Sequence, residues 1–304
     1  MLSFSTCWNS SRHTNGEDLV REILEMGFDT IEISHGLSVS LLPGIKQAYD
    51  RGGFKVSGLH NFCPSPVEVM IDAPDCYEFT SHRPYERERA ISLTMKTLEY
   101  AKQFNASYVV LHMGSVPMKK MSKQLTTMVK EGKLNSREYV KLKLKTIETR
   151  EKLAPLYVKR AKAALTMIAE KAEEVGIPVA VESRSKYEDV PSEREMIEIM
   201  REFEDNPFVG YWHDFGHVQL KANLSMLSHY EWLKTMQPYL IGCHLHDVQW
   251  PARDHQVPLT GTVQYDKLIP LVDPAKPMVW ELSPRRKKEQ ILECLPKWIE
   301  RYGP

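Results

Sequence analysis

Six ionisable side chains each stand where an apolar, β-rich run of the sequence ends. They are His60 after VSGL, His112 after YVVL, Glu182 after PVAV, Asp214 after GYWH, His244 after LIGC and Glu281 after PMVW. Imidazole and carboxylate groups are both ligands of divalent metals. Because unpaired buried charges are costly, six such groups that converged in one fold would need a compensating ion. We therefore predict a divalent metal site, provided that the fold gathers these strand ends.

The chain repeats a unit that would gather them. Residues 19–34, 97–112 and 167–183 each contain an amphipathic helical pattern, a Gly or Asn helix stop and a β-rich run. Eight such strands, the first over residues 3–7 and the others near Ile33, Val56, Val109, Val179, Tyr211, Cys243 and Trp280, predict an α/β fold, a (β/α)8 TIM barrel. In a barrel the carboxyl ends of the strands meet at one mouth, where active sites lie. A doubly wound open sheet is the alternative, but STCWNSSRHTNG after the first strand lacks a G-x-G-x-x-G loop.

Length and composition fit a single barrel domain over residues 1–304, with 42% hydrophobic residues. No apolar run approaches the roughly 20 residues of a membrane span, so we expect no membrane partner. The start MLSFSTCWNSSRH lacks a secretory pattern and the five cysteines are scattered, which favours a reduced, cytoplasmic protein. A formal net charge of zero disfavours a dedicated nucleic-acid binder.

Segment 117–163 departs from that charge balance, because it holds 14 Lys or Arg against 4 Glu. It is longer than an ordinary βα loop of roughly 2–6 residues. We predict a helical insertion after the fourth strand, broken near Gly132 and Pro155. It would leave from the catalytic face as a lid, a contact in a homo-oligomer or an attractor for anionic substrate. A solvated helical hairpin without such a role is the alternative.

Several short motifs in chain order carry a family resemblance. They are FDTIEIS, VVLHMGS, VAVES, DFGH, HLHD and VWELSP, at the second and the fourth to eighth strands. With them the chain resembles the xylose isomerase-like barrel superfamily, which includes sugar phosphate isomerases and epimerases, inosose dehydratases and endonuclease IV. The resemblance implies one divalent metal ion held by Glu182, Asp214, His244 and Glu281. The metal could be Mn, Co, Zn, Fe or Mg, with His246 as the second choice for the histidine ligand.

The resemblance also points to residues that bind substrate. DFGH supplies His217, which in such enzymes touches substrate or a further metal. Residues 250–268 resemble the family's D-x-H-x-P-x-G-x-G loop imperfectly, because Asp254 and His255 are adjacent and only Gly261 of the glycines remains. Arg253, Asp254 and His255 in this loop are candidates for substrate contact. Further candidates are His60, His112, His246 and Trp8, with Glu32 and His35 near the end of the second strand.

Two carboxylates that flank a bound sugar suggest the chemistry. A metal would polarise a carbonyl and its neighbouring hydroxyl, so that Glu182 could remove a proton from one face and Glu281 return one to the other. The leading hypothesis is therefore a metal-dependent isomerase or epimerase of a sugar or sugar derivative. The alternatives are a lyase or dehydratase that uses the same enolate, an endonuclease IV-like repair enzyme, and a sugar-binding barrel without activity.

Overall fold

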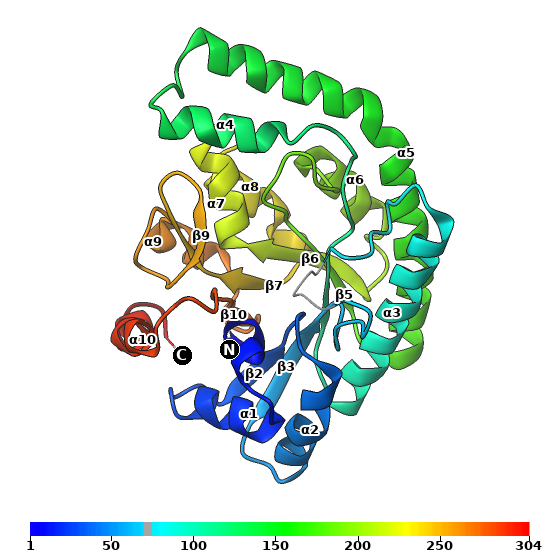
Figure 1. Ribbon diagram of the computed structural model, residues 1–304, viewed down its shortest axis with the longest axis vertical. Helices are drawn as coiled ribbons and strands as arrows, with labels where there is room; N and C mark the ends of the chain where they lie inside the picture. The colour runs from blue at the N-terminus through cyan, green and yellow to red at the C-terminus, as the bar shows by residue number, and fades with distance from the viewer. Residues whose placement is uncertain (70–74, 304) are drawn as a thin grey trace.

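Eight parallel strands close into a barrel in the computed structural model, which describes residues 1–69 and 75–303 (Figure 1). The strands are β1 (Leu2–Ser5), β2 (Thr30–Ile33), β3 (Lys55–His60), β4 (Val109–Leu111), β5 (Val179–Glu182), β6 (Val209–Asp214), β7 (Leu240–Leu245) and β10 (Met278–Trp280). They follow one another around the ring in chain order, and β10 closes against β1 with Met278 opposite Leu2. The predicted (β/α)8 barrel is confirmed.

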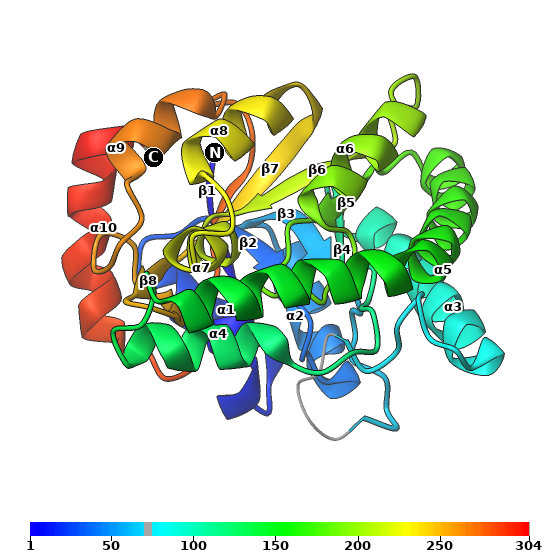
Figure 2. The same ribbon diagram turned by 90° about the horizontal axis from the view of Figure 1, so that it is seen from above.

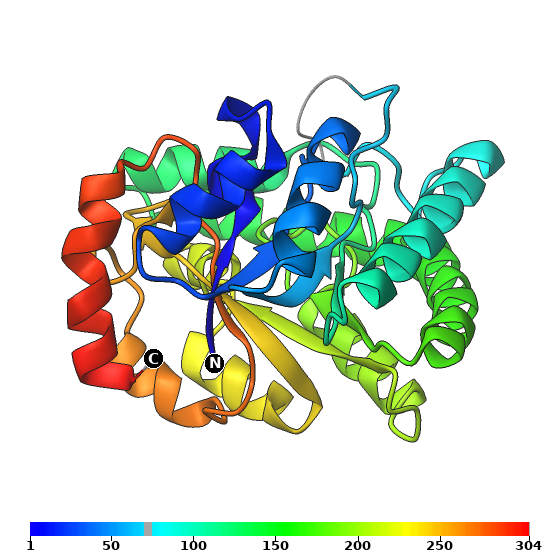
Figure 3. The ribbon, with the colours of Figure 1, turned by 90° about the horizontal axis from the view of Figure 1, so that it is seen from below.

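Helices surround this ring of strands (Figure 2). They are α1 (Gly16–Leu24), α2 (Leu42–Asp50), α3 (Pro84–Gln103), α4 (Met121–Lys130), α5 (Arg137–Val175), α6 (Glu193–Glu202), α7 (Phe215–Asn223), α8 (His229–Met236), α9 (Tyr265–Leu268) and α10 (Lys288–Tyr302). Seen from below, α1 and α2 lie side by side next to the first strands (Figure 3). Among the helices of residues 1–69 and 75–303, none is long and apolar enough to span a membrane.

The predicted helix stops have the backbone conformation expected of them. Gly27, Asn105 and Gly176 have φ values of 98°, 48° and 75°, in the left-handed region. Gly176 is the C-cap of α5, and its N–H bonds back to the carbonyl of Glu173. Glycine and asparagine tolerate this conformation, which ends the helix and turns the chain toward the next strand.

Aromatic rings fill the barrel below the mouth. Tyr108 and Trp212 are buried, with ring centroids 4.4 Å apart. A Cβ at Gly58 would lie 2.2 Å from the Tyr108 ring, and one at Gly242 would lie 2.4 Å from the Trp212 ring. Two strands therefore carry glycine where the rings need room. The rings form a packed floor, so the groups above them face only the mouth.

Segment 117–163 forms α4 and the part of α5 up to residue 163, and these two helices lie side by side (Figure 1). Tyr139 of α5 anchors the pair, because its hydroxyl donates to the carbonyl of Leu224 over 2.6 Å. The predicted break near Gly132 is present as a turn with a φ of 73°. The helical insertion after the fourth strand is therefore confirmed, and it packs against the segment that follows α7.

Two local predictions are wrong. Helix α5 runs through Pro155 without a break. The lost hydrogen bond and ring clash cost about 3 kcal/mol, which burial of residues such as Ala161 and Leu165 on the same helix offsets. The first strand was expected over residues 3–7, but it ends at Ser5 because Thr6–Trp8 form a short 3₁₀ turn. The side chain of Ser5 caps that turn at the N–H of Cys7.

Candidate metal centre at the carboxyl ends of the strands

Four buried side chains with ligand atoms meet at the carboxyl ends of four neighbouring strands. Glu182 ends β5, Asp214 ends β6, His244 lies near the end of β7, and Glu281 directly follows β10. One ligand atom from each lies within 4.8 Å of the others. These strands are consecutive in the ring, which brings together residues far apart in the sequence. The structure thus gathers all four residues that we expect to hold the metal.

Carboxylates on both sides of its imidazole ring hold His244 in one orientation. Its Nδ1 lies 3.1 Å from Oε1 of Glu182 and 3.4 Å from Oε2 of Glu281. Its Nε2 lies 3.1 Å from Oε2 of Glu32, which also accepts the hydroxyl of Tyr108 over 3.1 Å. A proton on Nε2, donated to Glu32, leaves the lone pair of Nδ1 facing the other ligands. Glu32, considered above for substrate binding, instead lies where the orienting partner of a metal-binding histidine lies.

The chemistry of this donor set fits a divalent cation. Burial opposes the ionisation of Glu182, yet the imidazoles of His112 and His244 hold its pKa well below the usual value. Burial also opposes the charging of His244, while Glu281 and Glu32 keep the pKa of this imidazole well above its usual value. Within the described residues, Oε2 of Glu182 is buried without a well-aligned hydrogen bond. Buried carboxylates next to an imidazole nitrogen suit Mn, Co, Zn, Fe or Mg.

Asp214 joins this cluster to the helix that follows it. Its Oδ1 accepts the backbone N–H of His217 over 2.6 Å and so caps the N-terminus of α7. The same oxygen lies 2.9 Å from Nε2 of His246. Its Oδ2 faces the cluster, 3.8 Å from Nδ1 of His244. Because both contacts restrain its rotation, the carboxylate is positioned in advance of any ligand.

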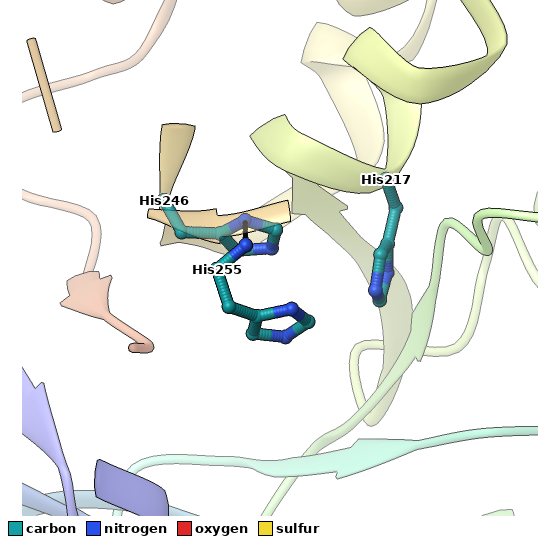
Figure 4. Close-up of side chains that lie close together, drawn as sticks. All are labelled: His217, His246 and His255. Carbon is teal, nitrogen blue, oxygen red and sulfur yellow. Dashed lines mark hydrogen bonds between the residues drawn. The ribbon is translucent and has the colours of Figure 1, made fainter. Parts of the chain in front are cut away.

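Three further histidines lie beside the cluster, on α7, after β7 and on β9 (Figure 4). Ring nitrogens of His217, His246 and His255 lie within 4.8 Å of one another. Both nitrogens of His246 are engaged, because Nδ1 accepts the backbone N–H of His255 over 2.9 Å and Nε2 donates to Asp214. Nε2 of His217 keeps its lone pair, since its Nδ1 donates to the carbonyl of Ser183. His246 therefore positions its neighbours, whereas His217 can face a substrate.

His60 and His112, both expected to bind substrate, lie next to each other and against Glu182 at the mouth. Nε2 of His60 lies 3.4 Å from Oε2 of Glu182. Nε2 of His112 contacts that same oxygen and the guanidinium of Arg184. Asp75 binds both groups, because it accepts from Arg184 and from Nδ1 of His112 at 2.9 Å each. Sequence reasoning did not assign Arg184 or Asp75 to the site, and Asp75 precedes a helix with no motif to mark it.

A cavity of about 360 Å³ opens beside Glu281. One wall is β9 (Arg253–Gln256), which pairs with β8 (Asp247–Gln249), and the other wall is formed by residues that follow β2 and β10. The residues of the cavity with ionisable side chains are His35, Arg253, Asp254, His255, Glu281, Arg285 and Arg286, with Cys7 beside them. The three loop residues expected to contact substrate, Arg253, Asp254 and His255, therefore share one cavity with a predicted catalytic glutamate.

The adjacency of Asp254 and His255 has a structural explanation. His255 has a positive φ of 50°, which turns its side chain back over the barrel mouth. Its ring stacks on His246 with centroids 4.0 Å apart, and its Nε2 lies 3.7 Å from Oε2 of Glu281. Asp254 and Glu281 hold the pKa of His255 well above its usual value although burial opposes this.

Trp8 does not lie with the other residues expected to bind substrate. It is 1% exposed, and its indole N–H donates to the carbonyl of Arg286 over 2.8 Å. The guanidinium of Arg12 covers its ring at 3.8 Å. Trp8 therefore packs beneath the segment after β10 and holds the backbone of Arg286.

Comparisons with known proteins agree with the barrel fold. A family model described as Xylose isomerase-like TIM barrel matches residues 20–302. No curated protein matches the chain significantly. A solved D-tagatose 3-epimerase-like protein is 18% identical with a TM-score of 0.69, over 98% of this chain and 97% of its own. A 3-keto-D-glucoside 4-epimerase from E. coli is 17% identical with a TM-score of 0.69, over 98% of both chains.

A third solved structure, the IOLI protein with a binding zinc atom, is 16% identical with a TM-score of 0.66. That alignment covers 99% of this chain and 97% of the other. At these identities the solved structures show a shared fold, and the family model extends over most of the sequence. This protein belongs to the xylose isomerase-like TIM barrel family.

Proposed function

We propose that this protein is a divalent-metal-dependent isomerase or epimerase of a sugar or sugar derivative. The observation that carries the proposal is the pair of buried carboxylates, Glu182 and Glu281, which approach Nδ1 of His244 from different strands. Solved structures of the same fold give further support, because they are described as epimerases of D-tagatose type, D-allulose and a 3-keto-D-glucoside. Another of them holds zinc.

The residues of this chain divide the chemistry between them. A divalent ion held by Glu182, Asp214, His244 and Glu281 would polarise the carbonyl and the neighbouring hydroxyl of the sugar, which acidifies the C–H bond between them. Glu182 accepts that proton on one face, and Glu281 delivers a proton to the other. Each positioned base or acid contributes roughly 100- to 10,000-fold to the rate.

His217 completes the site as a neutral hydrogen-bond acceptor. Burial lowers its pKa to about 4, so its imidazole carries no charge at neutral pH. Its Nδ1–H is held by the carbonyl of Ser183, which leaves the lone pair of Nε2 for a hydroxyl of the sugar. Such a contact orients the substrate between the two glutamates.

Proton abstraction is tested directly by hydrogen exchange. The purified protein, loaded with Mn²⁺ or Co²⁺, is incubated in D₂O with ketoses, inososes and 3-keto-glycosides, and NMR follows deuterium in substrate and product. We expect at least one substrate to gain carbon-bound deuterium and to yield an isomer or epimer. An eliminated product would assign the same residues to a lyase. No exchange with any of the three classes would refute the proposal.

Metal content is a separate measurement. Elemental analysis should find about one divalent ion per chain, and Asp214→Ala should lose most of it while the exposed Asp205→Ala does not. No bound metal after reconstitution would remove the site assignment.

We also expect no cleavage of abasic duplex DNA above a metal-stripped control, and efficient nicking would instead favour an endonuclease IV-like enzyme.

A further inference from the structure

Three arginines share the cavity beside Glu281. Arg253 comes from β9, and Arg285 and Arg286 follow β10 by a few residues. Arg253 and Arg285 are exposed, while Arg286 is half-buried. The cavity, of about 360 Å³, has room for a sugar with a substituent between the arginines and Glu281.

No carboxylate neutralises these three arginines. Within residues 1–69 and 75–303, none of them has an acidic oxygen within 4.0 Å, in contrast to exposed arginines such as Arg21 and Arg194, which pair with carboxylates. The acidic groups in the same cavity have other partners, because Asp254 pairs with His255 and Glu281 with His244. The three guanidinium charges are thus left to one another.

Arg286 shows the effect of this crowding. Its pKa is lowered by partial burial and then by the charges of Arg253 and Arg285. Its Nη1 donates to the amide oxygen of Gln256 over 2.7 Å, while its buried Nε has no hydrogen-bond partner among the described residues. The backbone carbonyl of Arg286 is fixed by Trp8, so the segment that carries the charges is held in place. A cluster of like charges on a held segment lowers stability unless an anion joins it.

We propose that this arginine cluster, Arg253, Arg285 and Arg286, binds the phosphate group of a phosphorylated sugar whose reacting carbons lie at Glu281. The placement of the reacting carbons at Glu281 rests on the proposed function, whereas phosphate binding by the arginines does not. A phosphomonoester carries a charge of about −1.5 to −2 and three acceptor oxygens, so it can occupy several guanidinium groups at once. A carboxylate offers one charge and two oxygens, which matches a three-arginine cluster less well.

Inorganic phosphate is the probe, since it needs no knowledge of the sugar. Isothermal titration calorimetry compares phosphate and acetate, in a constant chloride background, for the metal-loaded and metal-stripped full-length protein. We expect saturable phosphate binding that weakens about tenfold or more in Arg285→Gln and further in Arg285→Gln/Arg286→Gln. Arg285 is exposed and its side chain makes no hydrogen bond within the described chain, so its replacement leaves folding intact. Arg201→Gln, at the exposed C-terminal end of α6, is the matched control and should bind as the parent does.

Each outcome decides for or against the arginine cluster. Unchanged phosphate affinity in Arg285→Gln/Arg286→Gln would overturn it, because phosphate would then be bound elsewhere, such as directly at the metal. Acetate that binds as tightly as phosphate would overturn the phosphate assignment. Arginine-dependent phosphate binding without any metal binding would support the cluster and refute the proposed function. Deuterium exchange without phosphate binding would support the proposed function and refute the arginine cluster as a phosphate site.

Discussion

Strand β6 carries two neighbouring ionisable residues whose surroundings differ in one respect. Asp214 joins a buried cluster of carboxylates and imidazoles at the mouth of the barrel. His213, one residue earlier, lies outside that cluster and contacts Tyr211 and His229 of α8. Both sites are fully buried and rich in histidine. Only the first contains carboxylates, and this difference separates the candidate metal centre from a structural site.

The surroundings of His213, which we call the outer site, form a chain of hydrogen bonds between uncharged groups. Trp232 donates to the hydroxyl oxygen of Tyr211 over 2.8 Å, and that hydroxyl donates to Nδ1 of His213 over 2.7 Å. His213 must then carry its proton on Nε2, which lies 2.9 Å from Nε2 of His229. His229 in turn donates from Nδ1 to the amide oxygen of Gln219 over 2.9 Å. Every member is satisfied without a charge, so the chain joins β6 to α7 and α8 and leaves no group for chemistry.

The two sites show that partners, more than burial, decide what a histidine does. Burial, with a smaller effect of His229 and Lys221, holds the pKa of His213 well below its usual value. At the mouth, the carboxylates of Glu281 and Glu32 overcome burial and raise the pKa of His244. Buried carboxylates that hold an imidazole in its charged state can exchange the proton of that imidazole for a metal cation.

The largest expected effect tests whether the mouth is a catalytic site. Glu182→Gln and Glu281→Gln keep size and one oxygen but remove the basic carboxylate, so each should lower kcat by about 100-fold or more. Turnover of the substrate found by exchange is the measurement, with the exposed Glu204→Gln as control. In D₂O, one of the two variants should still label substrate without forming product, since it retains one of the two proton transfers. Near-normal turnover in both would end the two-glutamate mechanism.

A second change asks whether Glu32 orients the ligand histidine. Glu32→Gln keeps an acceptor for Nε2 of His244 but removes the negative charge beside it. Partners of metal-binding histidines contribute 10- to 100-fold to metal affinity, so we expect a loss of about tenfold. Competition with a chelator of known affinity measures it. An affinity equal to that of the parent would show that Glu32 does not act through His244.

A smaller effect should follow from the contact between Gly216 and His246. A Cβ at Gly216 would lie 1.9 Å from Cε1 of His246, so Gly216→Ala must displace the ring that holds Asp214. We expect a fall in metal affinity of a few-fold, up to about tenfold. In His246→Ala the ring is gone, and adding Gly216→Ala to it should cost nothing more. Additive losses in the double variant would place the effect of Gly216 elsewhere.

Much of the mouth could be predicted from the sequence, because it depends on where strands end. Glu182, Asp214, His244 and Glu281 each follow an apolar run, and a closed barrel leaves such residues only one place to meet. Strand periodicity does not reveal which ring nitrogen is free. The role of His246 depends on the backbone N–H of His255, which lies nine residues later on β9.

Other features lay outside what local patterns can show. Arg285 and Arg286 directly follow the motif at the eighth strand, so a signal was present, but their lack of acidic partners appears only in three dimensions. Pro155 is a helix breaker by propensity, and tertiary packing of α5 overrides it. Asp75 reaches Arg184 across 109 positions of sequence, a distance at which spacing carries no information.

The smallest effect concerns the outer site and its neutrality. Burial lowers the pKa of His229 to about 3, against about 6.5 for an unfolded histidine. Between these pH values the unfolded chain binds a proton that the folded chain does not, so the free energy of unfolding falls as the pH drops below about 6.5. The slope for one such imidazole is at most about 1.4 kcal/mol per pH unit.

His229→Gln tests this pH dependence, because the glutamine can accept from His213 and donate to Gln219 but does not titrate. Urea unfolding of metal-free protein from pH 7 to 5 should therefore show a shallower loss of stability in His229→Gln than in the parent, while the exposed His82→Gln keeps the parental slope. Equal slopes in all three proteins would mean that the outer histidines accept protons in the folded state, and the contrast between the two faces of β6 would then not be one of charge.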